Sequence, residues 1–536
     1  MANAIKKIYK PIIIAIAQWI LTTAFQVDRL FFRYDAPTIY FYIVKATYAI
    51  VLVITWCFIF FVFQKLKERD AVYIRGAQIF LIYFLLVMVL LTILWPGTWA
   101  WDDINTLESI VYYTSFFPWN NIITGLYQDI LLQLLPFPGG IIFLQNLIIS
   151  LCVAAVVVDL ESILDIKVSK NVCIDTLVKI IPFFLPPVLM YQFSGYRMGL
   201  YVYLELLLIV KIITAKIQGK EWTWSTILFV VFLCVIVSTW RTESIVYIPG
   251  LCVLILFLSK NIFPKNGKII CILAIVIGYI FASKCQSFAA RNNDYQMISL
   301  LCPGGELVRC ADIEADKVEL EMMDRVTDLE YIRNNPEIAG QYLYWGGCVR
   351  TGYTKAEYND YIKALVRLSL KYPKVVFEER MKMFIKSTNI FGDATTNVNT
   401  AEIFDEGITN SAQIEAYTFN WFAYRPIFKD LRKGLVNVLC CRNSEGEFIG
   451  VLYKIIWNAL IPIIILLVAW IRLLVKKQWF LWGICTAVIV RIPIIILTEP
   501  AGWIMYLLSF YFMGYVCLFY MLLRYISQKR KASEVE

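Results

Sequence analysis

The sequence contains no histidine among its 536 residues, and only 17% of them are Asp, Glu, Lys or Arg. The absence of imidazole excludes Ser-His-Asp hydrolysis, histidine-activated cysteine nucleophiles and histidine-ligated zinc or haem. The low charge, together with 60% hydrophobic residues, excludes an ordinary soluble protein, whose apolar share is about 45–50%. The chain is therefore expected in a membrane, where its chemistry uses carboxylates, cations or hydroxyls.

Long apolar runs predict an all-α polytopic membrane protein with about 12 transmembrane helices. A bilayer core of about 30 Å needs about 20 mostly apolar residues in each helix. The first run contains Gln18 and Trp19 and is either a span or an interfacial helix. We expect spans at approximately 11–27, 38–63, 77–95, 139–158, 172–192, 196–214, 223–240, 243–258, 267–283, 451–472, 478–497 and 501–524.

Lys and Arg cluster in alternate loops, which indicates the orientation of the spans because basic loops resist translocation. Both termini are then cytoplasmic. The net charge of +9 reads as a topology signal and gives no reason to expect a nucleic-acid partner. The basic loops are marked by Lys6 and Lys10, Lys65 and Arg75, Lys167 and Lys170, Lys216 and Lys220, Lys260 and Lys268, Lys476 and Lys477, and Lys529 and Arg530.

The longest polar stretch, residues 284–450, predicts a mainly helical external domain between spans nine and ten. It has no Asn-x-Ser/Thr acceptor, which favours a bacterial plasma membrane over a eukaryotic secretory one. The predicted organisation is a transmembrane region at 1–283 with a first large external loop at 96–138, the external domain at 284–450, spans ten to twelve at 451–524, and a cytoplasmic tail at 525–536.

Within the external domain, local signals predict three helices. A charged run without Gly or Pro covers 315–331. Thr354 and Glu357 have the spacing of a capping box, which opens a second helix that runs to 371. Tyr372-Pro373 breaks this helix, and a third covers 375–386.

Most of the fourteen cysteines lie in the apolar runs, where cysteine acts as a small apolar residue. In the external domain Cys302 and Cys310 flank Pro303-Gly304-Gly305. They are either a disulfide or two free thiols. No CxxC spacing occurs outside the spans, so a metal site is not favoured.

The loop between spans three and four carries the acids Asp102 and Asp103 but no Lys or Arg. Trp101 and its neighbouring tryptophans fit an aromatic belt at the membrane interface. The two carboxylates are either solvated loop charges, charges at a helix N-terminus, or reactive groups.

Pro96-Gly97, followed after four residues by Asp102, resembles the first external loop of the GT-C membrane glycosyltransferases, in particular a bacterial branch with a PG-x4-D pattern. The resemblance implies a GT-C-like fold and the transfer of one sugar, with inversion, from a polyprenyl-phosphate donor to a cell-envelope glycan or lipid outside the membrane. Asp102 matches the catalytic base of that pattern, and Asp103 stays open as an alternative. Relatives often carry His-Pro later in this loop, where this chain has Pro118-Trp119-Asn120-Asn121.

Such a transfer has a phosphate leaving group, so it needs one base and a cation clamp near the external face. Arg197, Arg241 and Arg491 are the arginines that the topology places there. We expect them to bind the donor phosphate, with Glu243, Glu499 and Trp101 in support. The alternatives are interfacial cations at Arg197 and Arg241, an ion pair from Arg241 to Glu243, and one from Arg491 to Glu499.

The remaining intramembrane charges are Lys45, Lys179 and Glu205. A structural pair between Lys179 and Glu205 is more economical than a proton relay. Asp129, in an amphipathic stretch of the first external loop, is expected on a solvated helix face.

Two other functions stay open: a transporter or flippase of a lipid-linked saccharide, and a glycan polymerase or ligase. Tyr342, Tyr344 and Trp345 in the external domain either bind a long acceptor or form core and membrane contacts. No cofactor is expected, and a divalent metal is not favoured because the adjacent aspartates lack the alternate spacing of a metal-binding pair. The expected partners are the polyprenyl-phosphate sugar donor, the acceptor and membrane lipids.

Overall fold

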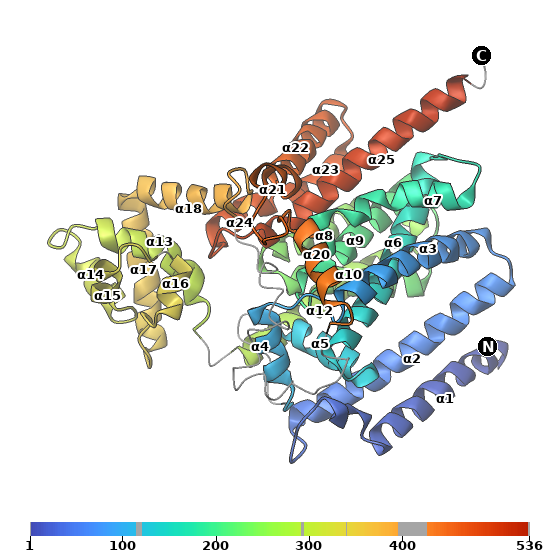
Figure 1. The fold of residues 1–536 in the computed structure, drawn as a ribbon, viewed down its shortest axis with the longest axis horizontal. Helices are drawn as coiled ribbons and strands as arrows, with labels where there is room; N and C mark the ends of the chain where they lie inside the picture. Colours follow the sequence, from blue (N-terminus) through green and yellow to red (C-terminus); the bar gives the residue numbers. More distant parts are fainter. Residues whose placement is uncertain (1, 114–120, 291–293, 339, 395–425, 534–536) are drawn as a thin grey trace.

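The computed structural model describes residues 2–113, 121–290, 294–338, 340–394 and 426–533. For some of these, among them Trp101, only the backbone is described. Apart from isolated β-bridges, the described residues form no strand. A bundle of long helices makes up most of the molecule, and a group of short helices lies to one side of it (Figure 1).

Eight helices within the described chain are long and apolar enough to cross a membrane, and one bent pair raises the number to nine. The bent pair joins Val172–Phe184 (α7 and η2) to Pro186–Gln192 (α8) at 81°. The chain is therefore a polytopic membrane protein. The eight are Ile39–Lys67 (α2), Ala71–Leu94 (α3), Pro138–Leu164 (α6), Met198–Gln218 (α9), Gly267–Ala289 (α12), Gly450–Val475 (α21, Gly450–Ile456, and α22, Leu460–Val475), Trp479–Thr498 (α23, Trp479–Ile489, and α24, Arg491–Thr498) and Leu508–Ser533 (α25).

The expected number of about 12 spans is thus not supported. Helix α1 (Ala2–Ala24) lies at the first expected span but is not among the eight. The two runs around residue 240 form shorter helices, α10 (Trp224–Trp240) and α11 (Tyr247–Phe257), joined through η3 (Thr242–Val246). At 1.5 Å per residue, α11 falls well short of a bilayer core of about 30 Å.

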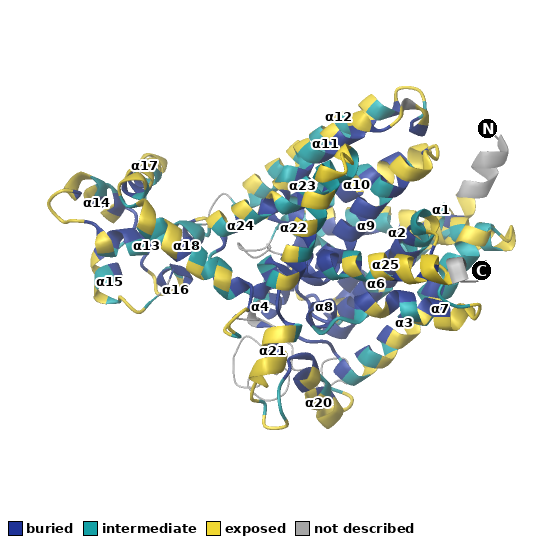
Figure 2. Cartoon of the chain, turned by 90° about the horizontal axis from the view of Figure 1, so that it is seen from above, coloured by how far each residue is buried: buried dark blue, intermediate teal, exposed yellow. Residues whose placement is uncertain are grey.

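The spans differ in how deeply they are buried. Helix α6 packs against both α3 and α9, whereas only 11% of the residues in the apolar windows of α2 and α12 are buried. Helix α2 lies at an edge of the bundle in Figure 1, and α12 at an edge in Figure 2. The start of α1, the α2–α3 and α6–α7 connections and the end of α25 lie at the end of the bundle away from the short helices (Figure 1). Lys65, Lys167 and Lys529 belong to these segments, so we refer to this as the lysine-rich end.

The short helices form an appended domain, which we define as Met297–Ser387. It has its own apolar core, which includes Leu301, Met323 and Leu343. Helix α18 leads back to the bundle, where it packs on α24 and on η6 (Ile504–Tyr506). The helices of the domain are Met297–Cys310 (α13), Lys317–Asp324 (α14), Leu329–Asn334 (α15), Gly340–Trp345 (α16), Lys355–Lys371 (α17) and Pro373–Ser387 (α18).

Of the helices predicted in this domain from local sequence signals, some are confirmed and one is wrong. The capping box of Thr354 and Glu357 is confirmed, with Glu357 N–H donating to Thr354 Oγ1 at 3.2 Å and Thr354 N–H donating to Glu357 Oε2 at 2.7 Å. The break at Tyr372-Pro373 is confirmed as well. The single helix expected over 315–331 is wrong, because Thr327 pairs with Val349 in a β-bridge and divides the segment into α14 and α15.

Candidate functional site

A tight turn after α3 sets the start of α4 (Trp101–Ile110), which carries Asp102 and Asp103. Gly97 has a φ of 104° and lies so close to Phe193 that an added Cβ would be 2.7 Å from the Phe193 carbonyl oxygen. Only glycine accommodates both the left-handed conformation and this approach. Thr98 N–H donates to the same carbonyl at 2.8 Å, so the turn is bound to the segment that joins α8 to α9.

The Asp102 carboxylate accepts a hydrogen bond from the Tyr196 hydroxyl, with 2.6 Å between Oδ2 and the phenol oxygen. Burial raises the pKa of Asp102 above its ordinary value, while the Tyr196 hydrogen bond and the charge of Arg197 oppose that rise. A carboxylate with a raised pKa that remains ionised is suited to accept a proton.

Asp102 lines a pocket of about 110 Å³ between the bundle and the appended domain. Five of its eleven lining residues are aromatic, and the bundle and the domain both contribute to the wall. The residues around it are Asp102, Tyr196, Arg197, Tyr295, Ile298, Gln341, Trp345, Pro500, Trp503, Met505 and Tyr506.

One of the three expected arginines lines this pocket, and a second contacts a residue of its wall. Arg197, just before α9, lines it, and its Nε has no hydrogen-bond partner among the described residues. Burial and the neighbouring charge of Arg241 both lower the pKa of Arg197. Arg241 is buried and does not line the pocket, but its guanidinium carbon lies 5.2 Å from the ring centroid of Tyr506, which does. Because two guanidinium groups repel each other, an anion bound between them relieves the repulsion.

Arg241 also forms the expected ion pair with Glu243, at 2.7 Å from Nε to Oε1. Its Nη1 still has no partner among the described residues. The pair and a role in ligand binding are therefore compatible, since Glu243 orients one edge of the guanidinium and leaves donors on the other.

Arg491, the third expected arginine, is not among the residues that line the pocket. Its Nη1 pairs with Glu205 Oε1 at 2.5 Å, and it also donates to the Tyr201 hydroxyl at 3.0 Å. The expected alternative, a pair between Arg491 and Glu499, is wrong. Glu499 instead accepts from the Ser387 hydroxyl at 2.9 Å and joins the appended domain to the bundle.

Asp103 turns away from the pocket and stabilises the start of its own helix. Its Oδ2 accepts the Ala100 N–H at 3.2 Å, and the residue is 3% exposed. The alternative of a charge at a helix N-terminus therefore fits Asp103, whereas Asp102 faces the pocket. The side chain of Trp101 lies outside the described part of the chain.

The expected solvated position of Asp129 is wrong. Asp129 is fully buried on α5 (Ile122–Leu134), and its Oδ2 accepts from the Tyr40 hydroxyl at 2.8 Å. One turn along the same helix, Gln133 accepts from Lys45 Nζ at 2.7 Å, and Lys45 pairs with Asp28 at 3.0 Å. Helix α5 thus turns polar groups toward α2, where they find partners.

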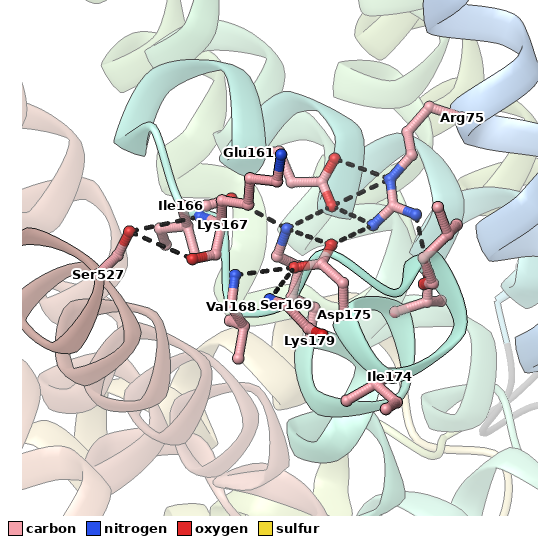
Figure 3. Close-up of polar contacts among 12 residues, drawn as sticks. Arg75, Glu161, Ile166, Lys167, Val168, Ser169, Ile174, Asp175, Lys179 and Ser527 are labelled. Carbon is pink, nitrogen blue, oxygen red and sulfur yellow. Dashed lines mark hydrogen bonds and ion pairs between the residues drawn. The ribbon is translucent and has the colours of Figure 1, made fainter. Parts of the chain in front are cut away.

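The expected pair between Lys179 and Glu205 is also wrong. Lys179 joins a four-residue ion cluster at the lysine-rich end, at 2.9 Å from Glu161 and 2.7 Å from Asp175 (Figure 3). Arg75 reaches the same two acids at 2.6 Å and 2.8 Å. Two cations and two anions neutralise one another here, which binds α3, α6 and α7 together and favours neither the simple pair nor a relay.

Cys302 and Cys310 do not form a disulfide, since both are free thiols on α13. Cys302 Sγ contacts the Pro500 carbonyl oxygen at 3.1 Å, next to the pocket. Among the described residues, no three or more Cys, Asp or Glu side chains are grouped so that they could hold a metal ion.

No sequence pattern pointed to several of the residues around Asp102. Tyr196, Tyr295 and Tyr506 are three of 32 tyrosines and belong to no motif. Arg432, on α20 (Lys429–Leu439), is buried against the turn before α4 and donates to the Gly97 carbonyl oxygen at 3.0 Å. Its place at the end of the long polar stretch indicated nothing about this contact.

Comparison of the chain with protein-family models, with curated proteins and with solved structures finds no match in any of the three. The candidate site therefore stands on its own geometry.

Proposed function

We propose that the chain is a membrane glycosyltransferase that moves one sugar from a polyprenyl-phosphate donor to a glycan or lipid acceptor of the cell envelope. One observation carries the proposal: the Asp102 carboxylate and the Arg197 guanidinium line the same pocket, and Arg241 contacts the ring of Tyr506 in its wall. A base and a cation clamp for phosphate are the groups that this reaction needs.

In the proposed reaction Asp102 removes the proton from an acceptor hydroxyl while that oxygen forms a bond to the anomeric carbon of the sugar. The bond from that carbon to the phosphate oxygen breaks, and its electron pair leaves with the polyprenyl phosphate. Arg197 and Arg241 neutralise the charge that grows on the phosphate, which makes a separate general acid unnecessary. This chemistry requires no imidazole, in keeping with a chain that has no histidine.

The position of the pocket supports an extracytoplasmic reaction. It lies next to the appended domain, at the end of the bundle away from the lysine-rich end. Basic connections stay on the cytoplasmic side, so we assign the pocket to the external face and both termini to the cytoplasm. We further place the protein in a bacterial plasma membrane.

The test compares two aspartate variants of the full chain in proteoliposomes, with a polyprenyl-phosphate sugar as donor and envelope extract as acceptor. Asp102→Asn should lower transfer by about 10²-fold or more, because no other group at this position accepts the proton. Asp103→Asn should keep most of the transfer activity and of the thermal stability, since the amide oxygen of asparagine can still accept the Ala100 N–H that Asp103 accepts. Full transfer by Asp102→Asn protein would reject Asp102 as the base.

A second candidate function, a transporter or flippase of lipid-linked saccharide, is favoured by the broken span at Val172–Gln192. Broken helices often line transport sites, and the segment that follows this one carries Tyr196 and Arg197. Transporter sites usually lie near the midplane, however, whereas this pocket lies at one end of the bundle. Movement of a fluorescent polyprenyl-phosphate sugar across proteoliposomes, unaffected by Asp102→Asn, would favour transport over transfer.

A further inference from the structure

Aromatic rings continue from the pocket onto the surface of the appended domain. Tyr295, Tyr344 and Trp345 contact one another, with ring centroids 5.1 to 6.5 Å apart. Trp345 is 54% exposed although it lines the pocket, and Tyr342 on the same short helix is 57% exposed. We call Tyr295, Tyr342, Tyr344 and Trp345 the aromatic ridge.

The ridge is continuous with the groups proposed to react. Tyr295 and Trp345 line the same pocket as Asp102, and the charge of Asp102 acts on the Tyr295 phenol. Helix α16, which carries the other ridge residues, lies on the side of the domain nearest the bundle (Figure 1). A molecule lying on the ridge therefore has one end beside Asp102 and the remainder on the domain surface.

The chemistry of the ridge fits a neutral saccharide. Pyranose rings have an apolar C–H face that packs on aromatic rings, and hydroxyl edges that need polar partners. The ridge offers both, since tyrosine carries a hydroxyl on an apolar ring and the Gln341 amide lies in the same pocket. Asp294 precedes Tyr295 and its charge acts on Tyr344, so this part of the ridge favours a neutral ligand over an acidic one.

We infer that the acceptor is a neutral glycan chain that lies along the aromatic ridge and presents its terminal hydroxyl to Asp102. The inference rests on the proposed transfer function and specifies its acceptor. The alternative occupant is the bilayer surface. The ridge favours the glycan, because its exposed rings are contiguous with a pocket that contains a carboxylate and a guanidinium, which a hydrocarbon surface would leave unsolvated.

The test measures glycan binding to the full chain in lipid nanodiscs by saturation-transfer difference NMR. The probes are neutral hexasaccharides of glucose, galactose, mannose, rhamnose or N-acetylglucosamine. At least one should bind, and Trp345→Ala should raise its Kd by about tenfold or more, as expected when a central aromatic anchor is truncated. Trp345→Phe, which keeps a ring face, should restore most of the affinity.

Phe377→Ala is the matched control, because Phe377 is an exposed aromatic of the same domain, at 66%, and does not line the pocket. It should leave the Kd unchanged. The inference is overturned if none of the hexasaccharides binds, or if Trp345→Ala and Phe377→Ala bind equally well.

A second measurement addresses the bilayer directly. Nanodiscs made with brominated phospholipid quench tryptophans that touch acyl chains, and the difference in quenching between wild type and Trp345→Phe isolates Trp345. We expect no difference, and a clear one would overturn the inference in favour of a membrane contact. The binding experiment is independent of transfer: glycan binding with no transfer would reject the proposed function alone, whereas transfer with an acceptor KM unaffected by Trp345→Ala would reject the ridge alone.

Discussion

The Tyr196 hydroxyl donates a hydrogen bond to Asp102 Oδ2 over 2.6 Å, and the next residue, Arg197, places its charge beside the same carboxylate. Both residues belong to the short connection that follows the broken span and precedes α9. This connection also receives the Thr98 N–H through Phe193. One connection thus fixes the position of Asp102 and adjusts its pKa.

Tyr196→Phe should move the acidic limb of the pH–rate profile to higher pH. In the wild type, the hydrogen bond from Tyr196 stabilises the ionised Asp102 carboxylate. Because the variant lacks this bond, the pKa of Asp102 should rise further. A base must be deprotonated to act, so the half-maximal rate should require a higher pH than in wild type. The measurement is transfer rate against pH at saturating donor.

Tyr191→Phe is the matched control for this experiment. Tyr191 is buried and its ring contacts that of Tyr196, but its hydroxyl has no hydrogen-bond partner among the described residues. Its loss should leave the acidic limb where it is. Equal shifts in the two variants would contradict a specific role for the Tyr196 hydrogen bond.

Arg491→Met should lower the free energy of unfolding by about 3–5 kcal/mol, because it leaves the Glu205 carboxylate buried without its partner. Adding Glu205→Gln should recover much of that loss. Urea unfolding in detergent gives the coupling energy of this double-mutant cycle. Because Arg491 does not line the pocket, the double variant should also retain transfer. If the double variant regains stability but loses transfer, Arg491 contributes to donor binding after all.

Sequence reasoning identified the membrane class, because hydropathy over 20 residues is a local property that tertiary structure does not override. It overestimated the number of spans because some apolar runs form short helices. The turn expected between residues 240 and 243 is present, but the helices on either side of it, α10 (Trp224–Trp240) and α11 (Tyr247–Phe257), are shorter than the eight spans. Helix ends depend on which polar groups find partners, and those partners come from elsewhere in the chain.

The same limit applies to the site residues. Asp102 was predicted from the PG-x4-D pattern and Arg197 and Arg241 from their places at span ends; the charge of Arg197 acts on Asp102 and that of Arg241 on Arg197, while their roles as base and phosphate ligands stay predictions. The pairs chosen for Lys179 and Arg491 were wrong, because sequence neighbours say little about contacts across a bundle. Glu205 meets Arg491 from a helix nearly three hundred positions earlier, and no local spacing encodes that contact.

Arg432→Met should lower the transfer rate by at least about tenfold. A factor of ten corresponds roughly to the free energy of one hydrogen bond from a charged donor, which this variant loses. Arg432 is buried and donates to the Leu94 and Gly97 carbonyl oxygens, at 3.4 Å and 3.0 Å, which holds the turn that leads to Asp102. A looser turn should reduce kcat more than the KM for donor, since Arg432 does not line the pocket. Lys433→Met, at an exposed neighbour on the same helix, should change neither value, and equal effects in the two variants would reject the positioning role.

Glu499→Gln should raise the Tm of the protein at pH 9 and leave it nearly unchanged at pH 4. Burial raises the pKa of Glu499 from 4.5 to about 8, partly opposed by the Ser387 hydrogen bond and by Arg380. Between about pH 4.5 and pH 8, Glu499 is therefore protonated in the folded state and ionised in the unfolded state. The stability from this proton is complete below about pH 4.5 and is lost as the pH rises through about 8. Thermal unfolding of wild type should show this decline between the two values, and the variant should not. Glu337→Gln, at an exposed position of the same domain, should follow wild type. If the Tm of Glu499→Gln protein still declines between these pH values, a group other than Glu499 binds the proton.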